Sequence, residues 1–233
     1  MQASSNIYGL STSRTNTDSH MLTNYEWGAV AYLTNSKYGR CTDGSCTEVT
    51  INNCSSFITG IGADSVSASQ SSTTCTTTAN KYNGTKGVLA STTGNITGVY
   101  DMSGGSHENA MGNISSTSGS YTFYPSSSGF ASGWYTTSTA KYVTTYTYDS
   151  SNSSNQTAYN RGRLGDATGE VVLSTGDSGG WYSDITNFPY YTTSWFLRGA
   201  FSYSSTKAGI FSFSYVDGSS RYYSTRAILV SLK

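Results

Sequence analysis

The stretch SWFLRGAFSYSSTKAGIFSFSYVDGSSRYYSTRAILVSL, residues 194–232, contains three runs that are typical of β-strands. The runs SWFLRGAF, AGIFSFSYV and RAILVSL are rich in aromatic and branched residues, and Gly, Ser and Thr separate them. Side chains alternate between the two faces of a strand, so Phe211 and Phe213 are predicted to fill the core. Ser212 and Ser214 are then predicted to point to the opposite face.

The segment TNYEWGAVAYLTNSKYG, residues 23–39, is the clearest predicted helix. Thr23 and Glu26 have the spacing of a capping box, and Gly39 supplies the stop. Apolar residues recur at helical spacing at Met21, Tyr25, Ala29 and Tyr32. Two further runs show the alternating residue pattern of β-strands, TEVTINN at residues 47–53 and AKYVTTYTY at residues 140–148. The Ser- and Thr-rich spans between them are interpreted as surface loops of one domain.

The composition excludes partners that bind through bulk charge. The 233 residues include 25 Gly and 20 Tyr, the charged fraction is 11% and the formal net charge is zero. Such a chain does not attract nucleic acid or an anionic membrane. No apolar run approaches the roughly 20 residues that a membrane helix needs, and no signal peptide opens the chain. We expect no membrane insertion by this segment, and any export signal or anchor upstream of it.

Four cysteines lie in polar, loop-like sequence: Cys41, Cys46, Cys54 and Cys75. Three disulfide pairings are possible. A bridge from Cys41 to Cys46 would close a tight turn around TDGS and leave Cys54 to pair with Cys75. Disulfides favour an extracellular or cell-surface location. A zinc site is the alternative, but no histidine or paired close spacing accompanies these cysteines.

The pentapeptide GDSGG, residues 176–180, surrounds the nucleophilic serine of trypsin-like proteases. A serine nucleophile needs a base, and the only histidines are His20 and His107. Neither has the cysteine-flanked setting of that family's base, and Trp181 stands where that family has proline. Ordinary turn residues in a Ser- and Gly-rich chain explain the match without catalysis. We therefore expect no enzyme, and a protease centred on Ser178 is the unfavoured alternative.

Three separated segments resemble, in order, those of the formylglycine-generating-enzyme family. NITGVYDMSGGSHENAMGN, residues 95–113, resembles its G-x-Y-D-M-S-G-N-x-W-E-W segment. WFLRGAF, residues 195–201, is similar to its arginine-glycine-glycine-serine-tryptophan strand, and STRAILV, residues 224–230, to its terminal G-F-R-L-V. EWGAVAYL in the predicted helix resembles its E-W-E-Y-A-A helix. The resemblance implies an α+β, C-type-lectin-like fold with small antiparallel sheets, one or two helices and long loops. It also implies a single domain over residues 1–233, with loop insertions near 40–95 and 113–160.

The departures from that family limit the chemistry. The enzymes use a cysteine pair shortly after the segment matched by residues 195–201, and residues 198–233 contain none. The family's calcium site draws on the asparagine and glutamate of G-N-x-W-E-W. Glu108 stands at the glutamate position, but Gly105 replaces the asparagine and Asn109 the second tryptophan. These departures argue against calcium, so Glu108 is predicted to be a solvated or helix-capping carboxylate, and no cofactor or metal is expected.

Within this fold, the chain is similar to the variable proteins of diversity-generating retroelements, in which a reverse transcriptase rewrites adenines near the 3′ end of the gene. Rewriting both adenines of an AAC codon yields residues such as Ser, Tyr, Phe, Asp, Thr, Val, Arg and Gly, but never Lys, Glu, Gln, Met or Trp. Residues 202–225 draw almost wholly on that set, and only Lys207 breaks it. They surround a frame formed by Ala208, Gly209, Phe211, Phe213 and Gly218.

This similarity implies a surface-displayed receptor or adhesin whose variable segment, residues 195–230, binds a protein or glycan on another cell or a phage. Tyrosines supply broad, stiff contact area and serines hydrogen-bond locally. The predicted ligand-binding residues are Ser202, Tyr203, Ser204, Ser205, Ser212, Ser214, Tyr215, Val216, Asp217, Ser219, Arg221, Tyr222 and Tyr223. Asp217 and Arg221 either supply charged specificity or form a surface ion pair.

Residues outside the variable set have other predicted roles. Trp195, Phe196 and Phe201 belong to the core or its edge, and Arg198 tethers loop carbonyls. Trp181 and Tyr182 either cover the core or form one wall of the site. Two alternatives stay open: an amphipathic β-segment in a Ser-rich protein without diversification, and an invariant surface or pilus-associated subunit.

Overall fold

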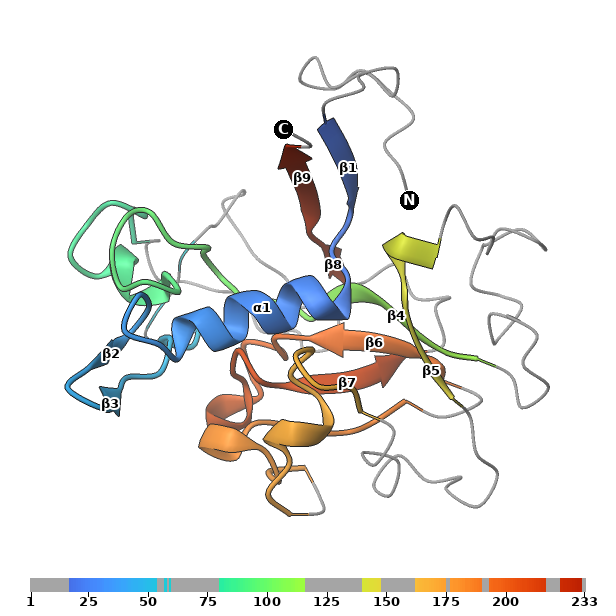
Figure 1. The fold of residues 1–233 in the computed structure, drawn as a ribbon. Coiled ribbons are helices and arrows are strands. Elements are labelled where there is room, and N and C mark those ends of the chain that lie inside the picture. Colours follow the sequence, from blue (N-terminus) through green and yellow to red (C-terminus); the bar gives the residue numbers. More distant parts are fainter. Residues whose placement is uncertain are drawn as a thin grey trace.

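The computed structural model describes residues 17–53, 57, 59, 80–115, 140–147, 162–174, 177–189, 193–216 and 223–231. Over these residues the chain is a mixed α+β structure with one α-helix, several small sheets and long loops (Figure 1). None of its helices there has the length and apolar character needed to cross a bilayer. Predictions on the following residues lie outside the described part: Cys54, Cys75, Asp217, Gly218, Ser219, Arg221 and Tyr222.

The largest sheet has the strand order β5 (Thr144–Thr147), β4 (Glu108–Ser115), β6 (Trp195–Arg198) and β7 (Phe213–Val216). A fifth strand, β8 (Ser224–Thr225), also pairs with β4. β4 is antiparallel to β6 and β6 to β7, whereas β5 and β8 run parallel to β4. β4 therefore joins segments that are far apart in the chain.

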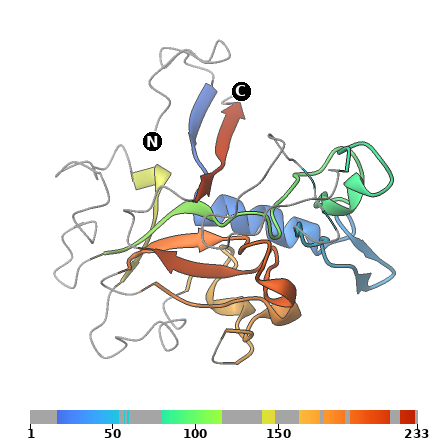
Figure 2. The ribbon, with the colours of Figure 1, turned by 180° about the vertical axis from the view of Figure 1, so that it is seen from behind.

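The first and last described strands form a separate antiparallel ribbon, β1 (Thr17–Met21) with β9 (Ala227–Ser231). The ribbon stands away from the larger sheet, as both views show (Figures 1 and 2). At its base, His20 Nε2 lies 2.7 Å from Glu26 Oε1 in the first turn of the helix. The ribbon is thus joined to α1 by a polar contact as well as by the covalent backbone.

The helix α1 (Asn24–Thr34) begins where the capping box predicts. The Glu26 amide donates to Thr23 Oγ1 at 3.3 Å, and Glu26 Oε2 accepts from the Thr23 amide at 2.9 Å. Gly39 is not the stop, because the helix ends at Thr34 with Asn35 as its C-cap. The predicted start is confirmed and the predicted end is wrong.

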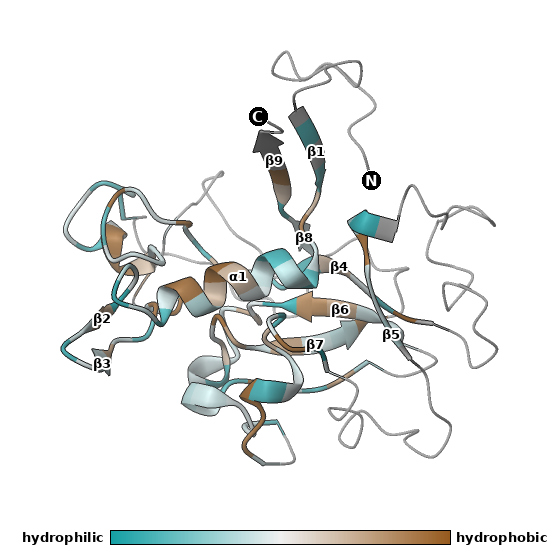
Figure 3. Ribbon diagram, viewed as in Figure 1, coloured by the Kyte–Doolittle hydropathy of each residue, from teal (hydrophilic) through white to brown (hydrophobic). Residues whose placement is uncertain are grey.

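The buried face of α1 differs from the apolar repeat in the sequence. Tyr25 is 44% exposed, whereas the buried helix residues are Asn24, Trp27, Gly28, Ala31 and Thr34. Asn24 is compatible with burial because its Nδ2 donates to Tyr146 Oη at 3.0 Å. The hydropathy colouring shows polar and apolar residues mixed along α1 (Figure 3). A buried face that includes polar residues gives no clean apolar period.

The core lies between α1 and the sheet. Trp27 from the helix and Phe196, Phe211 and Phe213 from the C-terminal region are at most 1% exposed and belong to one cluster. This confirms the prediction that Phe211 and Phe213 fill the core. The Trp27 indole N–H donates to the Ile210 carbonyl at 2.7 Å, which satisfies a buried donor.

The strand predictions are only partly correct. β6 and β9 lie where they were expected, but only the second half of AGIFSFSYV is a strand. Residues 47–53 form only isolated bridges, at Asn52 and Asn53. β1 and β4 were not predicted, and β5 covers part of the run at 140–148. The remaining short elements are β2 (Cys41–Thr42), β3 (Ser45–Cys46), η2 (Gly87–Ala90), η4 (Ala140–Tyr142), η7 (Gly169–Val171), η8 (Trp181–Ser183) and η9 (Ser205–Lys207).

Candidate ligand-binding surface

The loop that follows β6 is anchored on the segment that precedes β4. The Gly104 amide donates to the Gly199 carbonyl at 2.8 Å, and the Ser202 amide donates to the Gly105 carbonyl at 3.0 Å. Within the loop, the Ser204 amide donates to the Phe201 carbonyl at 3.0 Å. The backbone that carries Tyr203 is therefore held at several points.

Part of this loop adopts left-handed backbone conformations. Ala200 has a φ of 60° and Ser205 a φ of 55°, and Gly199 before them has a φ of 80°. Side-chain-bearing residues rarely adopt such angles, which cost on the order of 1 kcal/mol each. Strain of this kind persists where the surrounding contacts fix the backbone, and it is common at ligand-binding sites.

Four rings form a cluster beneath and beside this loop: His107, Phe201, Tyr203 and Tyr223, called here the aromatic cluster. Tyr203 stacks on Phe201 with ring centroids 4.9 Å apart and an interplanar angle of 14°. His107 contacts Phe201 edge-on at 4.0 Å, and Tyr223 lies 5.8 Å from Phe201. Two predicted binding tyrosines, 20 residues apart in the sequence, are thus brought together.

Within the aromatic cluster, exposure falls from the surface inward. Tyr203 is 46% exposed, while Phe201 and His107 are each 7% exposed. Because Phe201 covers one face of the Tyr203 ring, the other face is the one available to a ligand. Partial burial raises the pKa of the Tyr203 phenol, and proximity to Tyr223 raises it further. At neutral pH, Tyr203 therefore presents an uncharged ring with one polar hydroxyl.

His107 supports the cluster as a neutral ring. Burial lowers the pKa of His107 to about 4, although a hydrogen bond with the Arg198 backbone opposes this shift. The imidazole is thus uncharged at neutral pH and packs as an aromatic side chain. From the sequence, His107 was interpreted only as a possible catalytic base, and nothing in its local sequence indicates this packing role.

The other predicted binding residues differ in their exposure, and several are less exposed than expected. Ser205 is exposed, whereas Ser204, Ser214, Tyr215 and Tyr223 are partly buried. Ser212 is 1%, Val216 7% and Ser202 9% exposed, so the outward orientation predicted for Ser212 is wrong. The reason is a turn in which the Ser212 amide donates to the Gly209 carbonyl at 3.1 Å. β7 starts only at Phe213, so the strand alternation assumed in the sequence does not apply to Ser212.

Asp184 and Gly209 explain the position of that turn. Asp184 is fully buried, and its Oδ2 accepts a hydrogen bond from the Phe211 amide at 3.0 Å. A Cβ atom on Gly209 would lie 2.0 Å from Asp184 Oδ1, so glycine is required here. Burial raises the pKa of Asp184 well above its ordinary value. These contacts fix the turn between the exposed loop and β7.

Arg198 tethers loop carbonyls, as predicted. It is fully buried, and its Nη2 donates to the Ala167 carbonyl at 3.0 Å and to the Asp166 carbonyl at 3.4 Å. Its guanidinium carbon also lies 5.4 Å from the Trp27 ring centroid. Trp195 and Phe196 are buried, also as predicted. Arg198 therefore links β6 to residues 166–167 from within the core.

Glu108 is neither solvated nor a helix cap, contrary to the prediction. It is 6% exposed, and its two carboxylate oxygens bind the Arg226 guanidinium, with Nε to Oε2 at 2.8 Å. Burial raises the pKa of Glu108, and the ion pair with Arg226 opposes that shift. Because both oxygens are engaged, this carboxylate is poorly placed to bind calcium. In the described part of the chain, His, Cys, Asp and Glu residues form no group of three suited to a metal ion.

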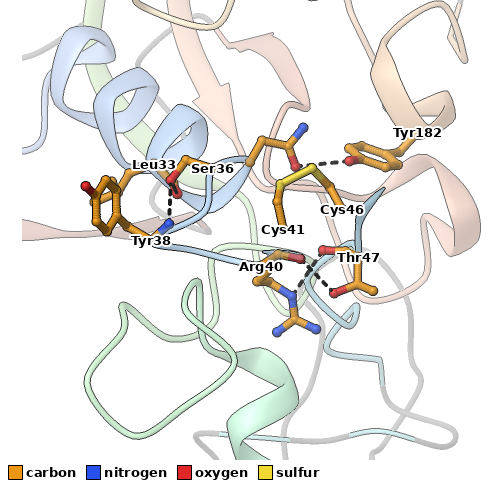
Figure 4. Close-up of a disulfide and its surroundings, with 9 residues drawn as sticks. Leu33, Ser36, Tyr38, Arg40, Cys41, Cys46, Thr47 and Tyr182 are labelled. Carbon is orange, nitrogen blue, oxygen red and sulfur yellow. Dashed lines mark hydrogen bonds between the residues drawn. A yellow bond between two sulfur atoms is a disulfide. The ribbon is translucent and has the colours of Figure 1, made fainter. Parts of the chain in front are cut away.

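The disulfide pairs Cys41 with Cys46, the bridge expected to close a tight turn around TDGS. It closes the β2–β3 hairpin just after α1 (Figure 4). Close by, Tyr182 Oη donates to Asn35 Oδ1 at 3.0 Å, and Trp181 packs on Phe211 with centroids 5.1 Å apart. Trp181 thus helps to cover the core, while Tyr182 is 37% exposed.

Asp177 and Ser178 of the GDSGG segment lie in an exposed turn, whereas Gly179 and Gly180 are buried. Asp177 Oδ1 accepts a hydrogen bond from Asn187 Nδ2 at 3.0 Å, and Ser178 is exposed. His20 contacts Glu26, whereas His107 packs in the aromatic cluster. The contacts of both imidazoles are therefore made with residues outside this turn.

Comparisons with known proteins add no further assignment: no protein-family model, curated protein or solved structure matches this chain.

Proposed function

We propose that this chain is a non-enzymatic, surface-displayed ligand-binding domain with a C-type-lectin-like fold. Its binding face consists of residues 199–207, with Tyr223 beside them, and its exposed positions are diversified as in the variable proteins of retroelements. In this proposal, the domain binds its ligand without a resident cofactor. The bound partner is a molecule on another cell or a phage.

The burial of the predicted frame and the exposure of Tyr203 and Ser205 are the main support for this proposal. Residues of the predicted frame, Ala208, Gly209, Phe211 and Phe213, are buried. Tyr203 and Ser205 are exposed on a loop whose backbone is fixed by hydrogen bonds to residues 104–105. Substitutions at such positions change the surface without creating cavities in the core.

The arrangement of the three segments that carry the family resemblance is further support. In the sheet register, Glu108 of the first segment lies opposite Arg198 of the second and Ser224 of the third. Glu108 also binds Arg226 of the third segment. Segments that resemble the family in sequence order therefore also lie next to one another.

Sequencing of the gene across many cells of one population tests the proposal. We expect substitutions at adenine-derived codons for exposed positions such as Tyr203 and Ser205. Codons for Gly209, Phe211 and Phe213 should stay fixed, since their side chains or close contacts lie in the core. An unchanging codon for Tyr203 across all cells would reject diversification.

A serine-reactive probe tests the non-enzymatic part separately. We expect the native protein and a Ser178→Ala variant to label equally weakly. Labelling that depends on Ser178 would show that the exposed turn is a nucleophilic site.

An invariant structural subunit is the second candidate, and exposed apolar side chains in and just after α1 favour it. Tyr25 is 44%, Leu33 52% and Tyr38 70% exposed. If this surface packs against a neighbouring subunit, the native protein will self-associate with rising concentration, as light scattering measures. A Leu33→Glu/Tyr38→Ser variant should then remain monomeric.

A further inference from the structure

We propose that the outer face of the Tyr203 ring is a stacking platform for the pyranose ring of a neutral glycan. This inference rests on the proposed function and names the class of ligand for its binding face. The sugar would lie with its C–H groups on the ring and its hydroxyls toward the surrounding loop.

The geometry of Tyr203 suits a flat ligand. Phe201 stacks beneath it at 4.9 Å and 14°, and the buried His107 supports Phe201 edge-on. The Tyr203 ring is therefore held from below while 46% of the residue remains exposed. The face of an aromatic ring carries partial negative charge, which attracts the weakly positive C–H groups of a sugar ring.

Two ion pairs lie among the described residues around the platform. Lys207 Nζ lies 3.9 Å from Asp177 Oδ2, and the Arg226 guanidinium binds Glu108. The imidazole of His107 is uncharged at neutral pH, because burial lowers its pKa to about 4. Such a surface gives no strong preference for an anionic or cationic ligand.

Small exposed hydroxyl side chains stand near both tyrosines in the sequence. Ser205 and Thr206 begin two residues after Tyr203, and Ser224 and Thr225 directly follow Tyr223. Ser224 also lies against the cluster, since its Oγ donates to the His107 carbonyl at 3.1 Å. Hydroxyls can donate to and accept from the hydroxyls of a sugar.

These neighbours favour a glycan over a protein ligand. Protein interfaces are dominated by Trp, Tyr and Arg anchors, while Ser and Thr are under-represented among the residues that carry binding energy. Here Tyr203 is the most exposed ring of the aromatic cluster, and Ser205 and Thr206, which follow it closely in the sequence, are exposed as well, which suits one sugar ring and its hydroxyl edge. Tyr203 lies at a position proposed to vary. The preference for a glycan would therefore hold for this sequence and not for variants with another residue at position 203.

Saturation-transfer NMR tests the platform on the full chain. The probes are methyl glycosides of glucose, galactose, mannose and N-acetylglucosamine, each with and without EDTA. We expect at least one glycoside to show transfer strongest to the C–H protons of one ring face, with or without EDTA. Tyr203→Ala should weaken its affinity by at least about tenfold, because the stacking contact is lost.

Two further variants make this test specific. Tyr203→Phe keeps the ring and should keep most of the transfer. Tyr38→Ala removes a tyrosine that is 70% exposed near the disulfide hairpin and should leave binding unchanged. No transfer with all four glycosides, or transfer that survives in a folded Tyr203→Ala variant, would overturn the platform.

A cell-binding assay separates this inference from the proposed function. Fluorescent tetramers of the domain are applied to bacterial cells, either untreated or oxidised with periodate, which cleaves sugar diols. Under the inference, binding depends on Tyr203 and disappears after oxidation. Tyr203-dependent binding that resists oxidation would identify a protein ligand. That result would support the proposed binding domain and contradict the glycan ligand. Binding that does not depend on Tyr203 on any cell would contradict both the proposed binding face and the glycan ligand.

Discussion

Arg198 shows how one residue can organise a core without taking part in binding. Burial lowers its pKa to about 10, so it stays protonated at neutral pH, and the nearby Asp166 opposes that shift. A buried cation is costly unless carbonyls, carboxylates or aromatic faces surround it. Here the carbonyls of residues 166–167 and the ring of Trp27 do so. Because its side chain is fully buried, Arg198 is unavailable to a ligand.

His107 gives a pH prediction at the same scale. Its pKa is lowered from 6.5 to about 4 in the folded state, so the folded state resists protonation. The stability linked to this ring is present above pH 6.5 and is lost as the pH falls towards 4. The full effect is about 3 kcal/mol. We expect His107→Phe, which retains an aromatic ring, to flatten the fall in unfolding free energy between these pH values.

Denaturant titrations of both proteins at several pH values measure this difference. Glu48 and Asp184, whose pKa values are raised by burial, titrate in both proteins and cancel in the comparison. Equal slopes for the parent and the variant would show that His107 is not the group responsible.

At the scale of elements, β4 is the strand that connects the rest of the sheet. It pairs with β5, β6 and β8, and its first residue binds Arg226 just before β9. Replacing Arg226 with Leu leaves the Glu108 carboxylate buried without this partner. We expect a loss of about 2 to 4 kcal/mol at neutral pH, measured by chemical unfolding.

The pH dependence and a double variant test that explanation. Burial raises the pKa of Glu108, so the protonated form favours the folded state and the loss should shrink as the pH falls. Glu108→Gln combined with Arg226→Leu removes the charge and should recover part of the stability. A double variant as unstable as Arg226→Leu alone would contradict a cost due to unpaired charge.

Local sequence signals predicted the elements whose stability is local. The capping box at Thr23 and Glu26 located the start of α1, and the aromatic runs located β6. β4 was missed because ENAMGNIS has few β-branched residues and belongs to the sheet through its partners. The partners of Glu108 and Asn24 lie 118 and 122 residues away, so no local pattern predicts their burial.

The same limit applied to the candidate surface. The frame residues Phe211 and Phe213 were predicted correctly, since aromatic residues seek burial. Ser212 was placed on the wrong side because the Asp184-capped turn, rather than a strand, precedes Phe213. The aromatic cluster depends on His107, which comes from a distant segment.

At the scale of the whole molecule, the C-terminal strands complete contacts that begin at the other end of the described chain. β9 pairs with β1 along its length, and β8 pairs with β4. A chain that stops after Tyr223 loses both pairings and Arg226. We expect it to lose cooperative unfolding in circular dichroism and dispersion in NMR spectra, because several long-range contacts vanish together.

A chain that stops after Ser231 is the matched control, since it keeps every residue of β9. It should unfold like the full chain. A chain ending at Tyr223 that unfolds as cooperatively as this control would show that the body folds without the ribbon.

The β1–β9 ribbon also determines how the molecule would respond to mechanical force. Thr17 lies opposite Ser231 at the outer end of the ribbon, so pulling these two residues apart would break the β1–β9 residue pairs one after another. A load applied between one strand and Tyr203 would instead pass along the covalent backbone of that strand to the base of the ribbon, where Met21 lies opposite Ala227. The hydrogen bonds between β1 and β9 would then carry little of the force, so attachment through one strand would leave the ribbon paired while the loop that carries Tyr203 is under tension.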